Sequence, residues 1–153
     1  MSRYLKFAAM ITTSTVVMLA LMYLNTYSLD HVFWSDTRGY MALIMGAAMA
    51  IVMLSFMLDM YDKPQLNIGI YLGAALVFAV SLALVRSQQT IDDVSWMKAM
   101  IPHHSIAILT SERAQILDPR VRELADSIIE TQRKEIAQMK ALIADLENAP
   151  IVQ

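Results

Sequence analysis

The chain has 153 residues, of which 57% are hydrophobic and only 17% are charged, and its formal net charge is −2. Soluble domains carry about a quarter charged residues, so this composition indicates a membrane protein. The length allows a membrane anchor plus one small helical module. Because the chain has no long basic run, we exclude nucleic acid as a partner. Cysteine is absent, which excludes disulfides and thiolate metal sites, so the 13 methionines are the available soft donors.

Three apolar stretches, at about residues 7–27, 41–58 and 68–85, approach the roughly 20 residues that cross a bilayer core. Tyrosine and tryptophan side chains, which favour the headgroup region, lie near the ends of these stretches. The first stretch is longer than the apolar part of a signal peptide, so we expect it to be retained. Residues 1–88 are therefore predicted to form a transmembrane region in the lipid bilayer.

The basic residues near the predicted spans favour one orientation. Arg3, Lys6 and Lys63 would lie on one side of the membrane, and Arg38 and Arg86 on the other. The positive-inside rule then favours a cytoplasmic N-terminus. Two crossings separate the first connection from the C-terminal part, so both are expected on the same side in either orientation. All three histidines would then face one compartment.

The remaining part of the chain, residues 89–153, has a polar helical pattern. Thr90 followed by Asp93 predicts an N-cap and an acidic first turn, and Asp118 followed by Pro119 predicts a second helix start. The second helix carries an apolar stripe that two short helices cannot bury alone. We predict an all-α chain whose helical hairpin forms a homo-oligomer, at least a dimer, with four-helix packing.

The first helix of this hairpin places four possible metal donors on one face. At about 100° per residue, Met97, Met100 and His104 lie within about 60° of one another, and His103 lies about 60° further round. Thioether and imidazole donors suit Cu(I) and Ag(I), whereas Mg²⁺ and Ca²⁺ prefer oxygen ligands. The alternative is that these side chains are ordinary surface or packing residues.

The second helix offers a facing group of side chains. Gln132, Glu135 and Met139 share an arc of about 60°. Met139 would add a thioether, and Glu135 would bind the metal or accept a hydrogen bond from a ligand histidine. The alternative for Glu135 and Gln132 is a solvated helix surface or a polar contact between helices.

The predicted membrane part contains further candidate donors. Asp30 and His31 lie in the first connection, on the same side as the histidine pair, where they are candidates to cap the site. The second span carries methionines at i, i+4 spacing, which form a thioether ladder for a soft ion or else a packing face helped by small residues. The ladder consists of Met41, Met45, Met49, Met53 and Met57.

Several motifs in the last third of the chain resemble one known family. The string MIPHH at 100–104, the string DPRVRELA at 118–125, and then Gln132, Glu135 and Met139 are similar in order to the DUF305 family. The resemblance implies ferritin-like helical packing, a largely extracytoplasmic location and copper binding associated with copper tolerance. We accordingly expect a bacterial inner-membrane protein with a periplasmic C-terminal domain.

The chain also departs from the family pattern after the histidine pair. Many soluble members look like two copies of the hairpin and carry further methionine or acidic residues where Ile106, Leu109 and Thr110 stand here. A complete site within one hairpin is therefore in doubt, which favours a site shared between subunits or completed by the membrane part.

The leading hypothesis is a membrane-anchored protein, not an enzyme, that binds Cu(I) or Ag(I) in copper or silver homeostasis or tolerance. Two alternatives are a ferritin-like metal-dependent oxidase and a structural membrane protein without a metal role. The oxidase reading is the weaker, because Glu112, Glu130 and Glu135 do not form the Glu-x-x-His pattern of di-iron bundles. The choice of Cu(I) or Ag(I), and of storage, transport or sensing, stays open.

Overall fold

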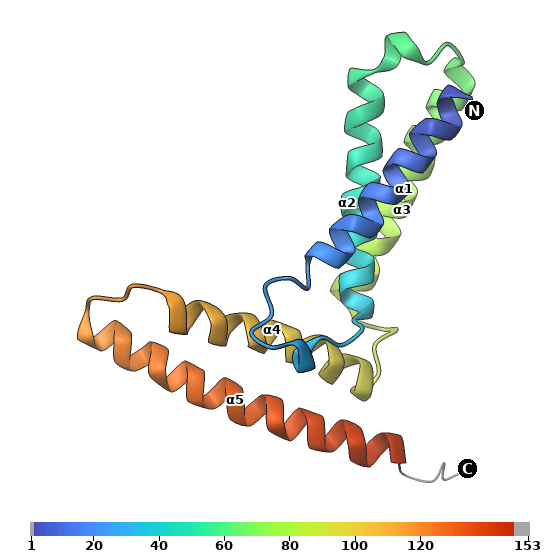
Figure 1. Ribbon diagram of the computed structural model, residues 1–153. Helices are drawn as coiled ribbons and strands as arrows, with labels where there is room; N and C mark the ends of the chain where they lie inside the picture. Colours follow the sequence, from blue (N-terminus) through green and yellow to red (C-terminus); the bar gives the residue numbers. More distant parts are fainter. Residues whose placement is uncertain (1, 149–153) are drawn as a thin grey trace. The chain divides into compact units, whose positions relative to one another are not determined.

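The computed structural model describes residues 2–148, and within that range the chain is helical and contains no strand (Figure 1). The all-α prediction is confirmed for this range. Its α-helices are α1 (Arg3–Leu21), α2 (Asp36–Phe56), α3 (Pro64–Ser87), α4 (Asp93–Arg113) and α5 (Pro119–Asn148), with short 3-10 helices η1 (Leu29–His31) and η2 (Leu58–Met60). The chain forms two compact units. Unit 1 contains residues up to Met22 and Thr37–Thr90, and unit 2 contains Tyr23–Asp36 and the chain from Ile91 onward.

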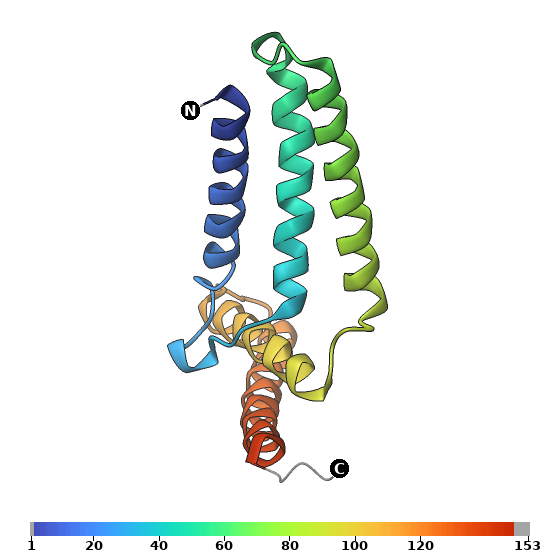
Figure 2. The same ribbon diagram turned by 90° about the vertical axis from the view of Figure 1, so that its right-hand side faces the viewer.

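Unit 1 consists mainly of α1, α2 and α3, which run alongside one another (Figure 2). The amino-terminal end of α1 lies at the same end of the unit as the connection between α2 and α3. In the described part of the chain, these three helices are long and apolar enough to cross a membrane. They correspond to the three predicted apolar stretches, although α1 ends at Leu21 and not near residue 27. The segment that follows, Tyr23–Asp36, belongs to unit 2.

A small aromatic core closes one end of unit 1. Leu54 is fully buried there, and the Tyr61 ring lies 5.5 Å from Phe7 and 5.1 Å from Tyr4, centroid to centroid. The buried Asn67 amide donates to the Tyr61 carbonyl at 2.9 Å and accepts from the Tyr4 hydroxyl at 3.0 Å. These bonds fasten the connection between α2 and α3 to α1.

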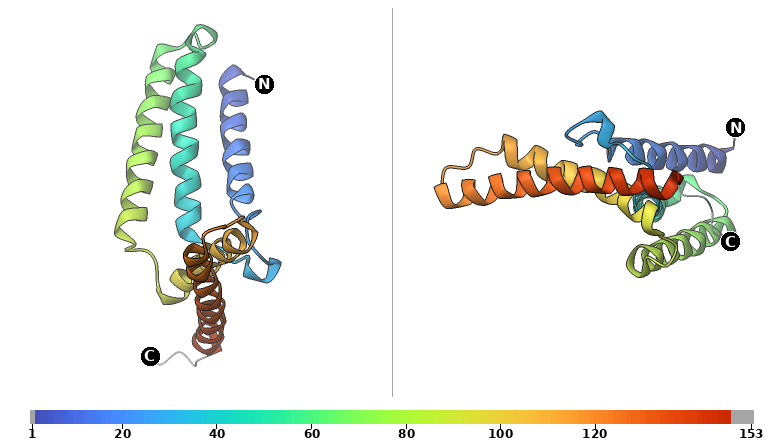
Figure 3. Two further views of the ribbon diagram at one scale, coloured as in Figure 1. Left: turned by 90° about the vertical axis from the view of Figure 1, so that its left-hand side faces the viewer. Right: turned by 90° about the horizontal axis from the view of Figure 1, so that it is seen from below.

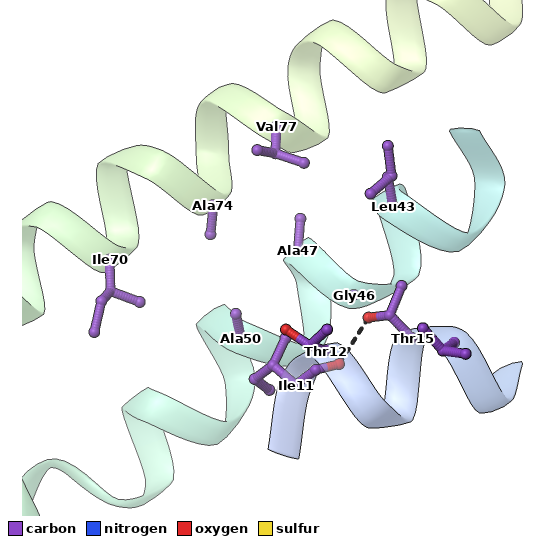
Figure 4. A pocket seen from close by; sticks show the side chains of 11 residues that line it. Ile11, Thr12, Thr15, Leu43, Gly46, Ala47, Ala50, Ile70, Ala74 and Val77 are labelled. Carbon is purple, nitrogen blue, oxygen red and sulfur yellow. Dashed lines mark hydrogen bonds between the residues drawn. The ribbon is translucent and has the colours of Figure 1, made fainter. Parts of the chain in front are cut away.

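Gly46 lets α2 approach α1 closely in the middle of unit 1. A Cβ atom at this position would lie 2.3 Å from Thr15 Oγ1, which is too short for any real contact. A pocket of about 440 Å³ lies beside this crossing, and its lining is almost entirely apolar (Figure 4). The Thr15 hydroxyl donates to the Ile11 carbonyl at 2.8 Å, so it is already used within α1.

Unit 2 is built on the antiparallel hairpin of α4 and α5 (Figure 3). Asp118 and Pro119 start α5 as predicted, and the Asp118 carboxylate accepts from the Arg120 N–H at 2.9 Å. The predicted cap at Thr90 is wrong. Asp92 caps α4 by accepting from the Ser95 N–H at 2.7 Å, whereas the Thr90 hydroxyl bonds to that of Tyr40.

The two helices of the hairpin bury one shared apolar core. It consists of Met97, Ile101 and Ile108 from α4 and Ile136, Met139 and Ile143 from α5. Ion pairs join the helices on either side of this core. Lys98 Nζ lies 2.5 Å from a Glu147 carboxylate oxygen, and Arg133 pairs with Glu112. These contacts fix which residues of α5 face the donors on α4.

The first connection packs on the hairpin. The Tyr27 N–H donates to Ser105 Oγ at 2.7 Å, Phe33 packs against the apolar core, and Asp30 pairs with Lys140 of α5 at 2.5 Å. Figure 3 shows this segment beside α4. The first connection, Tyr23–Asp36, thus belongs to the same compact unit as the hairpin.

Candidate metal centre

A pocket of about 240 Å³ lies between α4 and α5 in unit 2. It brings together four of the side chains that the sequence nominated as metal donors. Met97 and His104 come from α4, and Glu135 and Met139 from α5. The pocket lining is completed by Trp96, Gln138 and Leu142. Two thioethers, one imidazole and one carboxylate thus share one pocket.

Hydrogen bonding fixes the tautomer of His104. Its Nδ1 lies 2.9 Å from the carbonyl oxygen of Met100. A carbonyl only accepts, so Nδ1 carries a proton and donates it. In neutral His104 the Nε2 atom therefore keeps its lone pair, which is the form that binds metal.

The Nε2 atom of His104 lies 3.0 Å from Oε2 of Glu135. A carboxylate also only accepts, so two lone pairs meet here unless a positive species lies between them. That species is a proton, which gives an imidazolium and carboxylate pair, or a metal ion. Gln132 Nε2 donates to the same Glu135 oxygen at 3.2 Å, which orients the carboxylate.

Met97 and Met139 are buried side chains of the hairpin core, with 5% and 7% of their surface exposed. Both also line the pocket. Their thioethers are therefore held by packing, and little rotamer freedom is lost when they bind an ion. The lining residues Trp96, Gln138 and Leu142 are exposed, which leaves an entry route from solvent.

Two other predicted donors lie outside this pocket. Met100 packs against the core of the hairpin, and its contribution to the site is the carbonyl that His104 uses. His103 is exposed, and its ring centroid lies 6.1 Å from that of His104. All four predicted donors of the first hairpin helix thus lie on α4, and two of them, Met97 and His104, line the pocket.

Asp30 and His31 lie in unit 2 but are not part of the pocket lining. Bonding to Lys140, and then to Ser28, lowers the pKa of Asp30 to about 2. His31 Nδ1 lies 2.9 Å from Ser105 Oγ, and burial lowers the pKa of His31. These contacts hold the first connection against the hairpin at the residue next to His104.

Sequence reasoning missed Ser105, which is fully buried and contacts both Tyr27 and His31. A signal for it was present. Ser105 is a polar residue between Ile101 and Ile108, at the spacing of the apolar face of α4. A hydroxyl at such a position needs a buried partner, although the sequence does not say which segment supplies it.

Four methionines of the predicted ladder lie on α2 in unit 1, and the fifth, Met57, directly follows this helix. Met41 is exposed, whereas Met53 and Met57 pack against the core of unit 1. The remaining two, Met45 and Met49, are half-buried. Only the Met53 and Met57 end of the predicted ladder thus packs against the core of unit 1.

Within residues 2–148, no cluster of three or more His, Asp or Glu side chains is arranged to hold a metal ion. The larger pocket beside Gly46 in unit 1 offers no site either, since Thr12 and Thr15 are the only polar side chains in its lining.

The described residues define a helical protein with three helices of membrane-spanning length and a hairpin that carries a Met, His and Glu pocket. Residues 81–150 match the family model described as "Domain of unknown function (DUF305)". The chain is also 34% identical to an uncharacterized protein of Acanthamoeba polyphaga mimivirus over 135 residues, which covers 79% of this chain and 82% of that protein. The chain belongs to the DUF305 family, as its motifs predicted. No solved structure matches it.

Proposed function

We propose that this protein binds Cu(I) or Ag(I) as cargo in the hairpin pocket, through Met97, Met139 and Nε2 of His104. One observation carries the proposal. Two buried thioethers line the same pocket as an imidazole nitrogen whose lone pair faces a carboxylate. Sulfur and imidazole donors favour soft monovalent ions over Mg²⁺ or Ca²⁺. Glu135 supplies the negative charge that compensates the ion, either as a ligand or as a nearby partner.

We further propose that α1, α2 and α3 anchor the protein in a bacterial inner membrane, with unit 2 on the periplasmic side. The support is the length and apolar character of the three helices and the many apolar side chains that they expose. Leu72 and Leu76 on α3, for example, are about two-thirds exposed. Lipid would cover such side chains, and the positive-inside rule gives the orientation.

We also propose that a second copy of the chain packs against the outer face of α5. Large apolar side chains of the hairpin remain exposed after α4 and α5 have packed together. They include Leu117, Val121, Leu124, Leu142 and Leu146. Two hairpins would bury these side chains in a ferritin-like four-helix arrangement. Leu142 also lines the metal pocket, so a second copy would close the pocket as well.

The metal proposal is tested by titrating the purified full chain in detergent with Cu(I) or Ag(I) against a competing chelator. We expect His104→Ala to weaken binding by at least about tenfold, since even outer-sphere partners of metal ligands contribute that much. His103→Ala is the matched control, because this exposed neighbour does not line the pocket. Equal affinity in the two variants would overturn the proposal.

Glu135→Gln tests the role of the carboxylate. The substitution keeps the shape of the side chain but removes the charge that faces His104, so we expect weaker binding by about 10- to 100-fold. Glu130→Gln is the control on the same helix, because Glu130 is exposed and lies outside the pocket lining. The same chelator competition measures both variants.

A further inference from the structure

Unit 1 contains a second pocket with several thioethers, at the end where α1 begins. This pocket has a volume of about 390 Å³. Three methionines line it: Met10 of α1, Met57 directly after α2, and Met60 of η2. Met10 is far from Met57 and Met60 in the sequence, so the packing of α1 against the turn after α2 places them together.

The turn that carries Met57 and Met60 is held firmly. The Met60 N–H donates to the Met57 carbonyl at 2.9 Å, and Arg3 Nη1 donates to the Met60 carbonyl at 3.0 Å. Directly after the turn, Tyr61 packs on Phe7 of α1 and accepts from Asn67 through its carbonyl. The backbone of both methionines is thus fixed, and the flexible side chain of Met60, which is half exposed, is free to adjust to an ion.

The pocket also contains two cationic side chains, Arg3 and Lys6, whose charge opposes a bound cation. The charge of Arg3 is compensated, because its guanidinium lies 3.0 Å from the Asp62 carboxylate. Lys6 is exposed, and forms no ion pair among the described residues. Cu(I) and Ag(I) suit thioether sulfur and carry only one positive charge. The cationic side chains therefore repel them less than they would repel a divalent ion.

We propose that Met10, Met57 and Met60 form a second site for Cu(I) or Ag(I), in which thioethers are the only ligands. The inference rests on the proposed handling of a soft ion by the hairpin. Met57 is also the last methionine at the i, i+4 spacing that begins at Met41 on α2, so the methionines at this spacing end at the pocket. A set of thioethers without imidazole or carboxylate selects Cu(I) and Ag(I) against Zn²⁺ and harder ions.

The test is a Ag(I) titration of the full chain in detergent, with the methionine methyl groups labelled with ¹³C and followed by NMR. We compare the double variant Met10→Leu, Met60→Leu with the control Met18→Leu, Met22→Leu. Leucine conserves volume, and the control methionines lie outside both pockets. The Met57 methyl signal is expected to shift with Ag(I) in the control. In the pocket variant, the Ag(I) affinity that the Met57 signal reports should be weaker by at least about tenfold.

This experiment distinguishes failure of the hairpin site from failure of the second site. In His104→Ala, the Ag(I)-induced shifts of the Met97 and Met139 signals should disappear, and the shift of the Met57 signal should remain. If the Met97 and Met139 signals shift as in the native chain, the hairpin site alone is refuted. Equal Ag(I) responses in the two double variants would overturn the second site alone. Circular dichroism of each variant verifies that the helices are retained.

Lys6→Gln separates a metal from an anionic lipid as the occupant. If a cation binds, removing the unpaired positive charge of Lys6 leaves Ag(I) affinity unchanged or increases it. If a phospholipid headgroup binds, Lys6→Gln weakens binding of phosphatidylglycerol in mixed micelles, and the Met57 signal does not respond to Ag(I). The second result would overturn the proposal.

Discussion

The chemistry of unit 2 depends on which nitrogen of each histidine carries a proton. In His104 the Met100 carbonyl holds the proton on Nδ1, so Nε2 is directed at Glu135. In His31 the Nδ1 atom meets the hydroxyl of Ser105, which also accepts from the Tyr27 N–H. One histidine is thus prepared for a ligand, while the other fastens a loop.

The pH dependence of unit 2 follows from His31. Burial lowers its pKa below the ordinary value of about 6.5, so the folded state binds fewer protons than the unfolded state between these two values. The stability of unit 2 is therefore highest above about pH 6.5 and falls as the solution is acidified through that range. Asp30 affects the stability of unit 2 at lower pH. Its contribution to stability is present above its unfolded pKa near 3.8 and is lost as the pH falls through about 2.

Hydrogen exchange of residues 23–36 at pH 7 and pH 5 measures this effect, after correction for the intrinsic pH dependence of exchange. We expect protection to decrease at pH 5 in the native chain. In His31→Gln the change should be smaller, because the titrating group is absent, whereas His103→Gln should behave as the native chain does. Protection that is the same at both pH values in the native chain would contradict the expected role of His31.

At the scale of elements, signals between neighbouring residues predicted the helices well. They did not predict the contacts between residues that are distant in the sequence. Asp118 and Pro119 marked the start of α5, because a cap and a proline act on adjacent residues. Thr90 failed as a cap, since Asp92 competes for the same helix start and the Thr90 hydroxyl bonds to Tyr40, 50 residues away. The docking of the first connection is a tertiary contact of the same kind.

Ser105→Ala tests that docking. The substitution leaves the Tyr27 N–H and His31 without their partner in a partly buried contact, which costs about 1–3 kcal/mol. We expect faster hydrogen exchange in residues 23–36 and little change along α5. Ser127→Ala, at an exposed position of α5, is the control. Unchanged protection of residues 23–36 in Ser105→Ala would show that the serine does not hold this segment.

The crossing of α1 and α2 is tested by Gly46→Ala. The added methyl group would meet Thr15, so we expect a loss of about 1–3 kcal/mol in the stability of unit 1, as for other overpacked sites. Gly73→Ala is the matched control, because nothing lies within 4 Å of its Cβ position. Alanine is the better helix former, so the control is expected to be neutral or slightly stabilising. Thermal unfolding in detergent compares the two, and equal behaviour would contradict the close approach.

At the scale of the whole molecule, the sequence anticipated the apolar helices and the family, and it nominated most of the pocket. Four nominated donors share the pocket, namely Met97, His104, Glu135 and Met139. His103 was nominated by its place on the helix and in the MIPHH string, and it lies outside the pocket. A helical arc shows which side chains share a face, but the packing of α5 decides which part of that face is covered.

The proposed topology is tested by introducing single cysteines. Each would be the only cysteine in the protein, because the chain has none of its own. Asn25→Cys in the first connection and Ser127→Cys on α5 are expected to react with a membrane-impermeant maleimide from the same side. Asp59→Cys, in η2, should react only from the other side, since one crossing separates it from the first connection. Equal labelling of Asn25→Cys and Asp59→Cys from one side would contradict three spans.

X-ray absorption at the copper edge tests the hairpin site most directly. The full chain is loaded with one equivalent of Cu(I), and the native protein is compared with His104→Ala. The account predicts a first shell of sulfur together with nitrogen in the native protein, and loss of the nitrogen scatterer in the variant. A shell that is identical in both proteins, or one with no sulfur in the native protein, would contradict a soft-metal site built from Met97, Met139 and His104.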